Sequence, residues 1–414
     1  MTKQLWLAVG LVTAFRCSQA DAADRPDVLS EWTDVALTSL AAAKQPSYTQ
    51  SRTMAMVHLA LFEAINGPAG PYASYLEARA PKVMKASFTA PSDSLREATA
   101  AVAAHGVLAA LFPDQKSTFD SALEKSLGGS ATETAIAEGR RIAAAVLEAR
   151  AQDGAEAANT VRPLTRPGVY IPTAMPVGST WGEVKPWILK SGSQFRPSAP
   201  PALSSETWAK DYNEIKSLGA KVSSGRSAAQ TEAARYWAMI GPPSWIPIVR
   251  DLASRPGRTL VQNARLYALV SLAAADSYIA IFDAKYAFSF WRPITAIRNG
   301  DQDGNGATTR DPAWEPLIET PMHPEYPCAH CINSAAVGGV LEAEFGAGDI
   351  GTFQMTSLSL PGVTHRWNRI QDYLDEVANA RIWGGIHYRN SAKVGTAMGR
   401  SIAKVAVTSV LKPR

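Results

Sequence analysis

Alanine-rich segments make up much of the sequence, whereas runs rich in valine, isoleucine and threonine are scarce. Alanine is the strongest helix former, and branched side chains favour strands. We find no alternating pattern that indicates a strand, and no internal repeat. With 414 residues, of which 46% are hydrophobic, the chain can bury a sizeable core. The sequence therefore predicts an all-α protein, a large helical bundle with long irregular loops.

The boundaries of the expected helices follow from their stop and start signals. The segment 51–66 stops at Gly67-Pro68, the segment 93–112 stops before Pro113, and Ser130 to Glu133 has the spacing of a helix-capping box. The predicted helices cover about residues 27–43, 51–66, 93–112, 130–151, 205–218, 227–240, 258–290, 330–344, 368–382 and 390–411.

Two long segments are expected to be loops. Residues 160–203 are rich in proline, glycine and serine, and residues 299–326 form the second loop. The first could be a linker between two domains, but we favour an ordered loop that wraps the surface. The reason is that neither half of the chain contains a complete set of candidate site residues. We therefore predict a single helical domain over residues 23–414, with its site within 285–391.

The N-terminus has the features of an export signal. Lys3 precedes the apolar run 5–15, and Ala20-Asp21-Ala22 offers small residues at the cleavage positions. The run is too short to span a bilayer, and no later stretch is expected to be a membrane helix. The net charge of +4 is mild for this length and favours neither nucleic acid nor a membrane surface. We expect a secreted or periplasmic protein after removal of residues 1–22.

Basic residues recur in three fragments that are far apart along the chain. In the first, Lys285 and Arg292 are seven positions apart, close to two helical turns, so both can lean to one face. Pro293 then takes the chain out of the helix and leaves Arg292 free to reach inward. The alternative is an ordinary exposed basic face.

The second and third fragments each add a histidine. His330 precedes a small, apolar helix, where first-turn N–H groups attract anions and an imidazole can exchange a proton near neutral pH. Arg381 and His387 would face about 240° apart on a continuous helix, but Gly384-Gly385 permits a break that brings them together. The alternatives are a packed or capping histidine at 330 and a surface histidine at a helix corner. Since no carboxylate lies inside these fragments, they predict a pocket for a compact oxyanion.

The combination of these fragments resembles a known signature. The order Lys-x6-Arg-Pro, Pro-x-x-His and Arg-x5-His is similar to that of vanadium-dependent haloperoxidases and the phosphatidic acid phosphatase type 2 superfamily. Flanking segments resemble the bacterial haloperoxidase branch over most of the chain that follows the signal; they are 52–66, 274–276, 282–286, 314–316, 323–327 and 384–388.

The resemblance implies a helical fold that holds vanadate. Lys285, Arg292, Arg381 and the backbone N–H of Ala329 would bind its oxygens, and His387 would coordinate the vanadium. His330 would act as the acid/base. The implied reaction is oxidation of a halide by hydrogen peroxide, followed by attack on a small organic acceptor.

Phosphate can occupy the same kind of pocket, because the two oxyanions share shape and charge. The alternative function is therefore an acid phosphatase, in which His387 forms a phospho-histidine and His330 protonates the leaving alcohol.

The sequence departs from the family pattern at three positions. The family has Pro-Ser-Gly-His where this chain has Cys328 and Ala329, so Cys328 would be a weaker donor to the bound oxyanion than serine. We hypothesise that Cys328 and Cys331 form a disulfide, the alternative being two unpaired cysteines. Ser391 replaces an aspartate that would orient His387, and the sequence does not identify a substitute. A further alternative is thus a non-redox oxyanion-binding relative without catalysis.

Two residues beside the motifs are candidates for a halide or substrate pocket. His323 stands where the family has Phe or His, and histidine there implies bromide or iodide rather than chloride; the alternative is a loop histidine without contact to the site. Trp291 is the second candidate, with a place in the core wall as the alternative. His58 and His105 lie on apolar segments and are expected to be packed residues. The sequence does not predict the oligomeric state.

Overall fold

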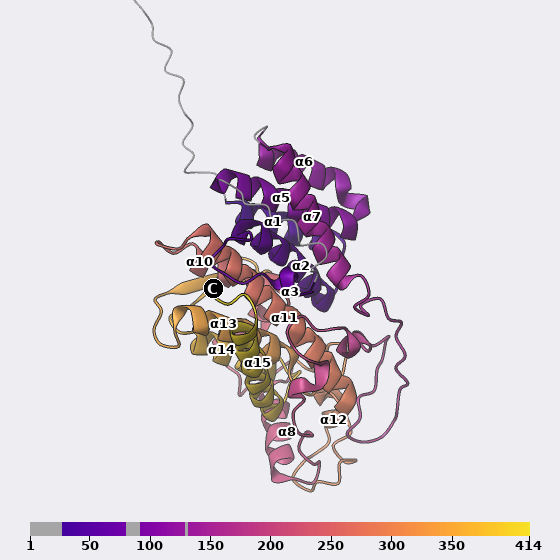
Figure 1. Ribbon diagram of the computed structural model, residues 1–414. Helices are drawn as coiled ribbons and strands as arrows, with labels where there is room; N and C mark the ends of the chain where they lie inside the picture. Colours follow the sequence, from indigo (N-terminus) through magenta and orange to yellow (C-terminus); the bar gives the residue numbers. More distant parts are fainter. Residues whose placement is uncertain (1–26, 80–91, 129–130) are drawn as a thin grey trace, which may run out of the picture.

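The structure is a computed structural model, which describes residues 27–79, 92–128 and 131–414 (Figure 1). The expected export signal at residues 1–22 lies outside the described residues, so secretion stays a prediction. The described chain is all-α apart from one small hairpin, which confirms the predicted fold class.

The N-terminal half forms a compact group of helices, drawn in indigo to magenta in Figure 1. Their starts are fixed locally: the side chains of Asp27, Ser92 and Thr132 each accept a hydrogen bond from a first-turn N–H. The helices of this group are α1 (Val28–Ala42), α2 (Ser47–Asn66), α3 (Tyr75–Arg79), α5 (Asp93–Leu111), α6 (Lys116–Leu127) and α7 (Glu133–Arg150).

The C-terminal half forms a second group around the longest helix, α11 (Leu260–Phe288). A capping box between Thr259 and Gln262 starts α11. By length and composition this helix could cross a membrane, contrary to our expectation, but 94% of its most apolar window is buried inside the protein. It is the core helix onto which this half packs. The other helices of the group are α12 (Pro293–Arg298), α13 (Ala329–Phe345), α14 (Ile370–Trp383) and α15 (Arg389–Ser409).

Along the sequence, the two groups are separated by the long loop predicted at 160–203 and by α8 (Glu206–Leu218), α9 (Ala228–Tyr236) and α10 (Ile246–Ala253). This loop is ordered and contains only short 3₁₀ turns. It is anchored by the buried Asp276 of α11, whose carboxylate accepts the backbone N–H groups of residues 187–189 at 2.7–2.8 Å. The second predicted loop, 299–326, is also confirmed.

The one element class that we did not predict is a strand. β1 (Phe353–Thr356) pairs antiparallel with β2 (Thr364–Trp367), with Phe353 opposite Trp367 and Thr356 opposite Thr364. The helices α6 and α10 and the shorter α3 and α12 were also not predicted from the sequence.

A single cluster of buried apolar side chains runs from α1 to α15. Helix α2 packs against α11 and joins the two groups of helices. This continuity agrees with one domain, although the predicted boundaries at 23 and 414 stay a prediction.

Candidate functional site

Lys285 lies near the C-terminal end of α11 and is completely buried. Its ammonium group donates to the backbone carbonyls of Pro324 and Glu325, both at 2.8 Å. The C-terminal end of α11 thus places a basic side chain against the loop that precedes α13.

Arg292 follows a sharp end of α11. Ser289 takes a left-handed conformation with φ of 47°, and Arg292 itself is extended at the N-cap of α12, with Pro293 as the first helical residue. The buried guanidinium donates to the His323 carbonyl at 2.9 Å and to the Ile386 carbonyl at 2.9 Å. The inward reach expected for Arg292 is confirmed.

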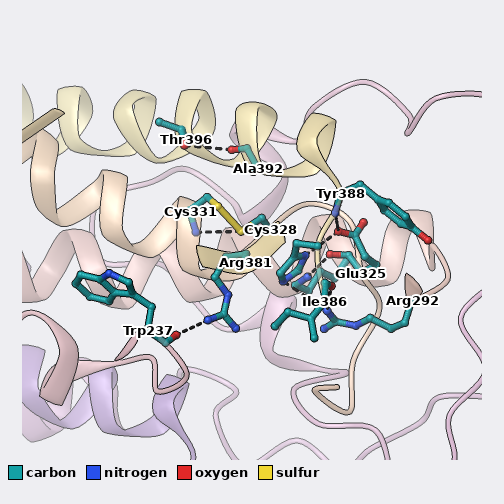
Figure 2. Close-up of a disulfide and its surroundings, with 12 residues drawn as sticks. Trp237, Arg292, Glu325, Cys328, Cys331, Arg381, Ile386, Tyr388, Ala392 and Thr396 are labelled. Carbon is teal, nitrogen blue, oxygen red and sulfur yellow. Dashed lines mark hydrogen bonds and ion pairs between the residues drawn. A yellow bond between two sulfur atoms is a disulfide. The ribbon is translucent and has the colours of Figure 1, made fainter. Parts of the chain in front are cut away.

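Arg381 comes from the last turn of α14 and is also buried. One guanidinium nitrogen donates to the Trp237 carbonyl (Figure 2). Its Nε is buried and has no hydrogen-bond partner within the described structure. A buried donor of this kind is costly unless a ligand accepts from it.

The break at Gly384-Gly385 occurs as predicted. Helix α14 ends at Trp383, and Gly385 has φ of 78°. A Cβ at Gly385 would overlap the carbonyl oxygen of Gly219, so both the conformation and the space require glycine. The chain turns back at this point, and His387 Nε2 comes within 3.4 Å of Arg292 Nη1.

Glu325 is a residue of this pocket that the sequence did not reveal. Its carboxylate is fully buried and accepts from His387 Nδ1 at 2.7 Å. It also accepts from the Tyr388 N–H at 3.1 Å (Figure 2). Glu325 thus makes the carboxylate contact to His387 that we expected of an aspartate at the position of Ser391. The available signal was an acidic residue inside the apolar, proline-rich segment 323–327.

His330 occupies the first turn of α13 and is buried. Its Nε2 lies 3.3 Å from the Met239 carbonyl. The N–H groups of Ala329 and His330 belong to the first turn, where a helix has no carbonyl of its own to accept from them. They are donors available to an anion.

Cys328 and Cys331 form a disulfide at the start of this helix, as hypothesised (Figure 2). A disulfide sulfur carries no hydrogen, and Cys328 Sγ itself accepts from the Cys331 N–H at 3.2 Å. The expectation that Cys328 donates to the oxyanion is therefore wrong. Its backbone N–H is also engaged, donating to the Ser391 carbonyl.

The pocket contains more basic than acidic side chains, so its positive charge is only partly neutralised. Burial lowers the pKa of Arg292 to about 10. Burial, and in second place the charge of Arg292, lower the pKa of Arg381 to about 9 and that of Lys285 well below its ordinary value. Glu325 is hydrogen-bonded to His387, and burial raises the pKa of its carboxyl group to about 7. An anion would relieve this charge excess.

The site histidines respond to the same environment. Burial lowers the pKa of His323, His330 and His387 well below the ordinary value, and the neighbouring cations lower it further. Neutral imidazoles keep one nitrogen lone pair each, which is the form needed to coordinate a metal centre or to accept a proton.

A cavity of about 490 Å³ opens onto the site, and His323, Ala329, His330 and His387 line it. A second cavity of about 430 Å³ reaches Arg292. The segment 318–322 contributes to the walls of both. Lys285 and Arg381 are not among the residues that line either of these two cavities.

The two candidates for the halide pocket differ in outcome. His323 Nδ1 lies 3.0 Å from Arg292 Nη2, and the ring packs edge-on against Phe282. Trp291 does not line the cavity: it stacks on Trp208 within a separate buried cluster. The assignment of Trp291 to the pocket is therefore corrected to the alternative, a core wall.

The remaining histidines lie elsewhere. His58 is packed, as expected, between Thr33 and Ser271. His105 is only partly buried and pairs with Asp120. Within the described residues, no group of three or more His, Cys, Asp or Glu side chains could hold a metal ion.

The chain is similar to known proteins in both sequence and structure. Residues 265–413 match the family described as the VCPO second helical-bundle domain. The vanadium chloroperoxidase of Curvularia inaequalis is 31% identical over a region that covers 32% of this chain and 25% of that protein, so the match spans a quarter of that relative. A crystal structure of a bacterial vanadium-dependent iodoperoxidase aligns with a TM-score of 0.78 at 24% identity, over 92% of this chain and 96% of that chain. An apo-type bacterial vanadium-dependent chloroperoxidase aligns with a TM-score of 0.65 at 19% identity, over 87% and 92%. The two structural matches establish a shared helical fold.

Proposed function

Because residues 265–413 belong to the family of the VCPO second helical-bundle domain, within a chain that has the fold of bacterial vanadium haloperoxidases, we propose that this protein is a vanadium-dependent haloperoxidase. It oxidises a halide with hydrogen peroxide and passes the oxidised halogen to a small organic acceptor. The observation that carries the proposal is the convergence of two imidazoles and three buried cations, with His387 held by Glu325.

The donors present fit a tetrahedral oxyanion. Three buried cations and one carboxylate lie in the site, and Arg381 Nε has no partner within the described structure. The N–H groups of Ala329 and His330 stand in the first turn of α13, where the helix has no carbonyl for them. Lys285, Arg292, Arg381 and the Ala329 N–H would hold vanadate oxygens, and His387 Nε2 would ligate the metal. When bound, vanadate supplies the Lewis acidity that makes peroxide reactive towards halide.

The chain's own groups determine protonation in the site. Glu325 accepts from His387 Nδ1, which leaves the lone pair on Nε2, the atom that faces Arg292. The neutral ring of His330 can take a proton from hydrogen peroxide as it binds. Lys285 and Arg292 neutralise the negative charge that develops when that proton leaves.

The finer assignments of halide and location belong to the same proposal. The lowered pKa of His323 keeps its imidazole neutral beside the cavity. We expect bromide or iodide to be oxidised more readily than chloride. The similarity to an iodoperoxidase supports this preference. The enzyme would act outside the cytoplasm, secreted or periplasmic, with residues 1–22 removed.

An acid phosphatase activity is the second candidate, and one observation favours it. The Glu325–His387 pair restores the carboxylate–imidazole contact that a histidine nucleophile needs. Phosphate would then bind where vanadate binds, and His330 would protonate the leaving alcohol.

The test uses purified protein with and without vanadate. Vanadium content is measured by elemental analysis, and bromination of a phenol-red-type dye is measured with peroxide and bromide. We expect a vanadate-dependent rate that is lost in His387→Ala and retained in His105→Ala, which changes a histidine far from the site. Hydrolysis of a chromogenic phosphate ester without vanadate would favour the phosphatase. Tight vanadate binding with neither activity would contradict both functions and point to a non-redox oxyanion-binding relative.

A further inference from the structure

The segment 237–240, which directly follows α9, lies against the oxyanion site. The Trp237 carbonyl accepts a hydrogen bond from the Arg381 guanidinium (Figure 2). The Met239 carbonyl lies 3.3 Å from His330 Nε2. Residues of the same segment also line the 490 Å³ cavity. Two carbonyls of one short segment therefore contact a cation and the acid/base of the site.

These two contacts determine how the two site residues are oriented. Among the described residues, the Trp237 carbonyl is the only acceptor that is hydrogen-bonded to the Arg381 side chain, which is buried. A backbone carbonyl can only accept, so the neutral ring of His330 carries its proton on Nε2 and its lone pair on Nδ1. The directions of the guanidinium group and of the imidazole thus depend on where the segment 237–240 lies.

The hairpin holds this segment from its other side. The Tyr236 hydroxyl donates to the carbonyl of Met355 in β1 at 2.6 Å. In the loop between the strands, Ser357 Oγ donates to the Tyr236 carbonyl at 2.7 Å, and Ser359 Oγ accepts from the Met239 N–H at 3.0 Å. The segment has no helix or strand of its own, so these bonds to the hairpin replace the regular backbone bonds that it lacks.

Glu376 of α14 joins the segment, the hairpin and the helix. Its Oε1 accepts from the ring nitrogen of Trp237 at 2.7 Å and from His365 Nδ1 at 2.6 Å. Its Oε2 accepts from the ring nitrogen of Trp367 at 3.0 Å. His365 and Trp367 both belong to β2. One carboxylate therefore binds three side chains, and the buried ring of Trp237 is one of them.

Helix α14 contacts Trp237 at both of its ends. Glu376 and Arg381 are five positions apart, so their side chains point about 140° apart around the helix axis. Glu376 binds the indole ring, and Arg381 binds the carbonyl of the same residue. If the ring lost its acceptor, the carbonyl would no longer be held in place, and the guanidinium that it orients would move with it.

We propose that Glu376 is a positioning residue, which holds Trp237 between α14 and the hairpin and thereby fixes the two carbonyls that orient Arg381 and His330. Glu376 is not among the residues that line the cavity, so it acts through the segment 237–240. For the part that Arg381 and His330 play in turnover the proposal rests on the proposed function, but the orientation of Arg381 does not depend on turnover.

The binding test compares Glu376→Leu, which removes the acceptor, with Glu376→Gln, which keeps an oxygen for the ring of Trp237. We expect the dissociation constants of vanadate and of phosphate, measured by calorimetry, to rise about 10-fold in the leucine variant and to recover largely in the glutamine variant. The matched control is Glu344→Leu. Glu344 is 21% exposed against 24% for Glu376 and pairs with Arg258 and Arg265 instead. Unchanged constants in Glu376→Leu, or an equal rise in the control, would overturn the proposal.

A double-mutant cycle tests the route through Trp237. Trp237→Phe removes the ring N–H but keeps the carbonyl. If Glu376 acts through this ring, the double variant Trp237→Phe/Glu376→Leu should bind vanadate no more weakly than Glu376→Leu alone. Losses that multiply in the double variant would show that Glu376 acts by another route.

A crystal structure of Glu376→Leu without a bound oxyanion separates the proposal from the proposed function. We expect the Arg381 guanidinium to leave the Trp237 carbonyl, and an unchanged position of both groups would contradict the positioning role. This result needs neither turnover nor a bound anion. If the guanidinium moves, but the unchanged protein binds vanadate and does not halogenate, the positioning role stands and the haloperoxidase function fails.

Discussion

Glu325 determines which nitrogen of His387 faces the site, because its carboxylate accepts from Nδ1. The motif residues themselves could be predicted from the sequence, since Lys285, Arg292, His330, Arg381 and His387 have characteristic spacing. Glu325 could not be predicted, because it lies 62 positions from its partner and no local pattern reports a contact that only the folded chain makes. The disulfide followed from local spacing, whereas its effect on Cys328 as a donor required the structure.

Replacing Glu325 by glutamine tests this positioning role. The amide can accept from Nδ1 but carries no charge, so we expect vanadate affinity to fall about 10- to 100-fold. The measurement is vanadate binding by titration, alongside the halogenation rate. Glu325→Asp should recover part of the loss. Glu63→Gln is the control, since Glu63 is another buried carboxylate with a pKa of about 7 that lies outside the site; an equal loss there would indicate a general effect on folding.

The raised pKa of Glu325 also predicts how the vanadate-free protein responds to pH. Burial raises this pKa from 4.5 to about 7, so folding disfavours the ionised form. The group's contribution to stability is therefore fully present below pH 4.5 and is lost as the pH rises through 7. We expect the Tm of the vanadate-free protein to fall between pH 5 and 8, and to fall less in Glu325→Gln. Identical pH profiles for the two proteins would contradict the assignment.

At the level of elements, the site depends on where two helices end. Helix α11 ends at Phe288 and α14 ends at Trp383, and each end releases a short segment that carries a site residue. These stops could be predicted from Pro293 and from Gly384-Gly385. The hairpin could not, because β1 and β2 have four residues each, too few to show an alternating pattern.

Local sequence features also explain why the helices α6 and α10 were not predicted. Helix α6 buries only Phe119, so its sequence has no apolar stripe. Helix α10 follows a pair of prolines and has a third proline in its first turn. A helix tolerates proline at that position, but in a sequence the prolines indicate the end of a helix.

Gly385→Ala tests the turn after α14. The left-handed φ and the overlap with the Gly219 carbonyl together are expected to cost about 1–3 kcal/mol and to displace His387. Urea unfolding gives the stability change, and vanadate titration gives the effect on the site. Gly348→Ala is the control, because a Cβ there meets nothing within 4 Å. Equal stability and vanadate affinity in the two variants would show that the turn is not required.

At the scale of the whole molecule, the two groups of helices share one core. The buried cluster includes Trp32 of α1 and Ile402 of α15, and α2 packs along α11 between them. The cavity is built the same way, because Tyr48 of α2 and His387, which follows α14, both line it. This arrangement follows from long-range packing, which sequence periodicity does not report.

A shared core predicts joint unfolding. We expect urea transitions followed by helical circular dichroism and by tryptophan fluorescence to coincide, since separating the groups would expose the faces of α2 and α11 to water. Hydrogen exchange of α2 and α11 should show the same opening free energy. Two separated transitions, with α1 to α7 melting apart from the rest, would contradict this expectation.

The short stretch 318–322 borders both cavities, the one with the histidines and the one that reaches Arg292. Because the same segment lines both cavities, the shapes of the two cavities depend on each other. A larger side chain facing one cavity shifts the backbone of 318–322, which also lines the second cavity. Substitutions that reshape one cavity would therefore alter the other at the same time, and paired substitutions along 318–322 would give non-additive outcomes.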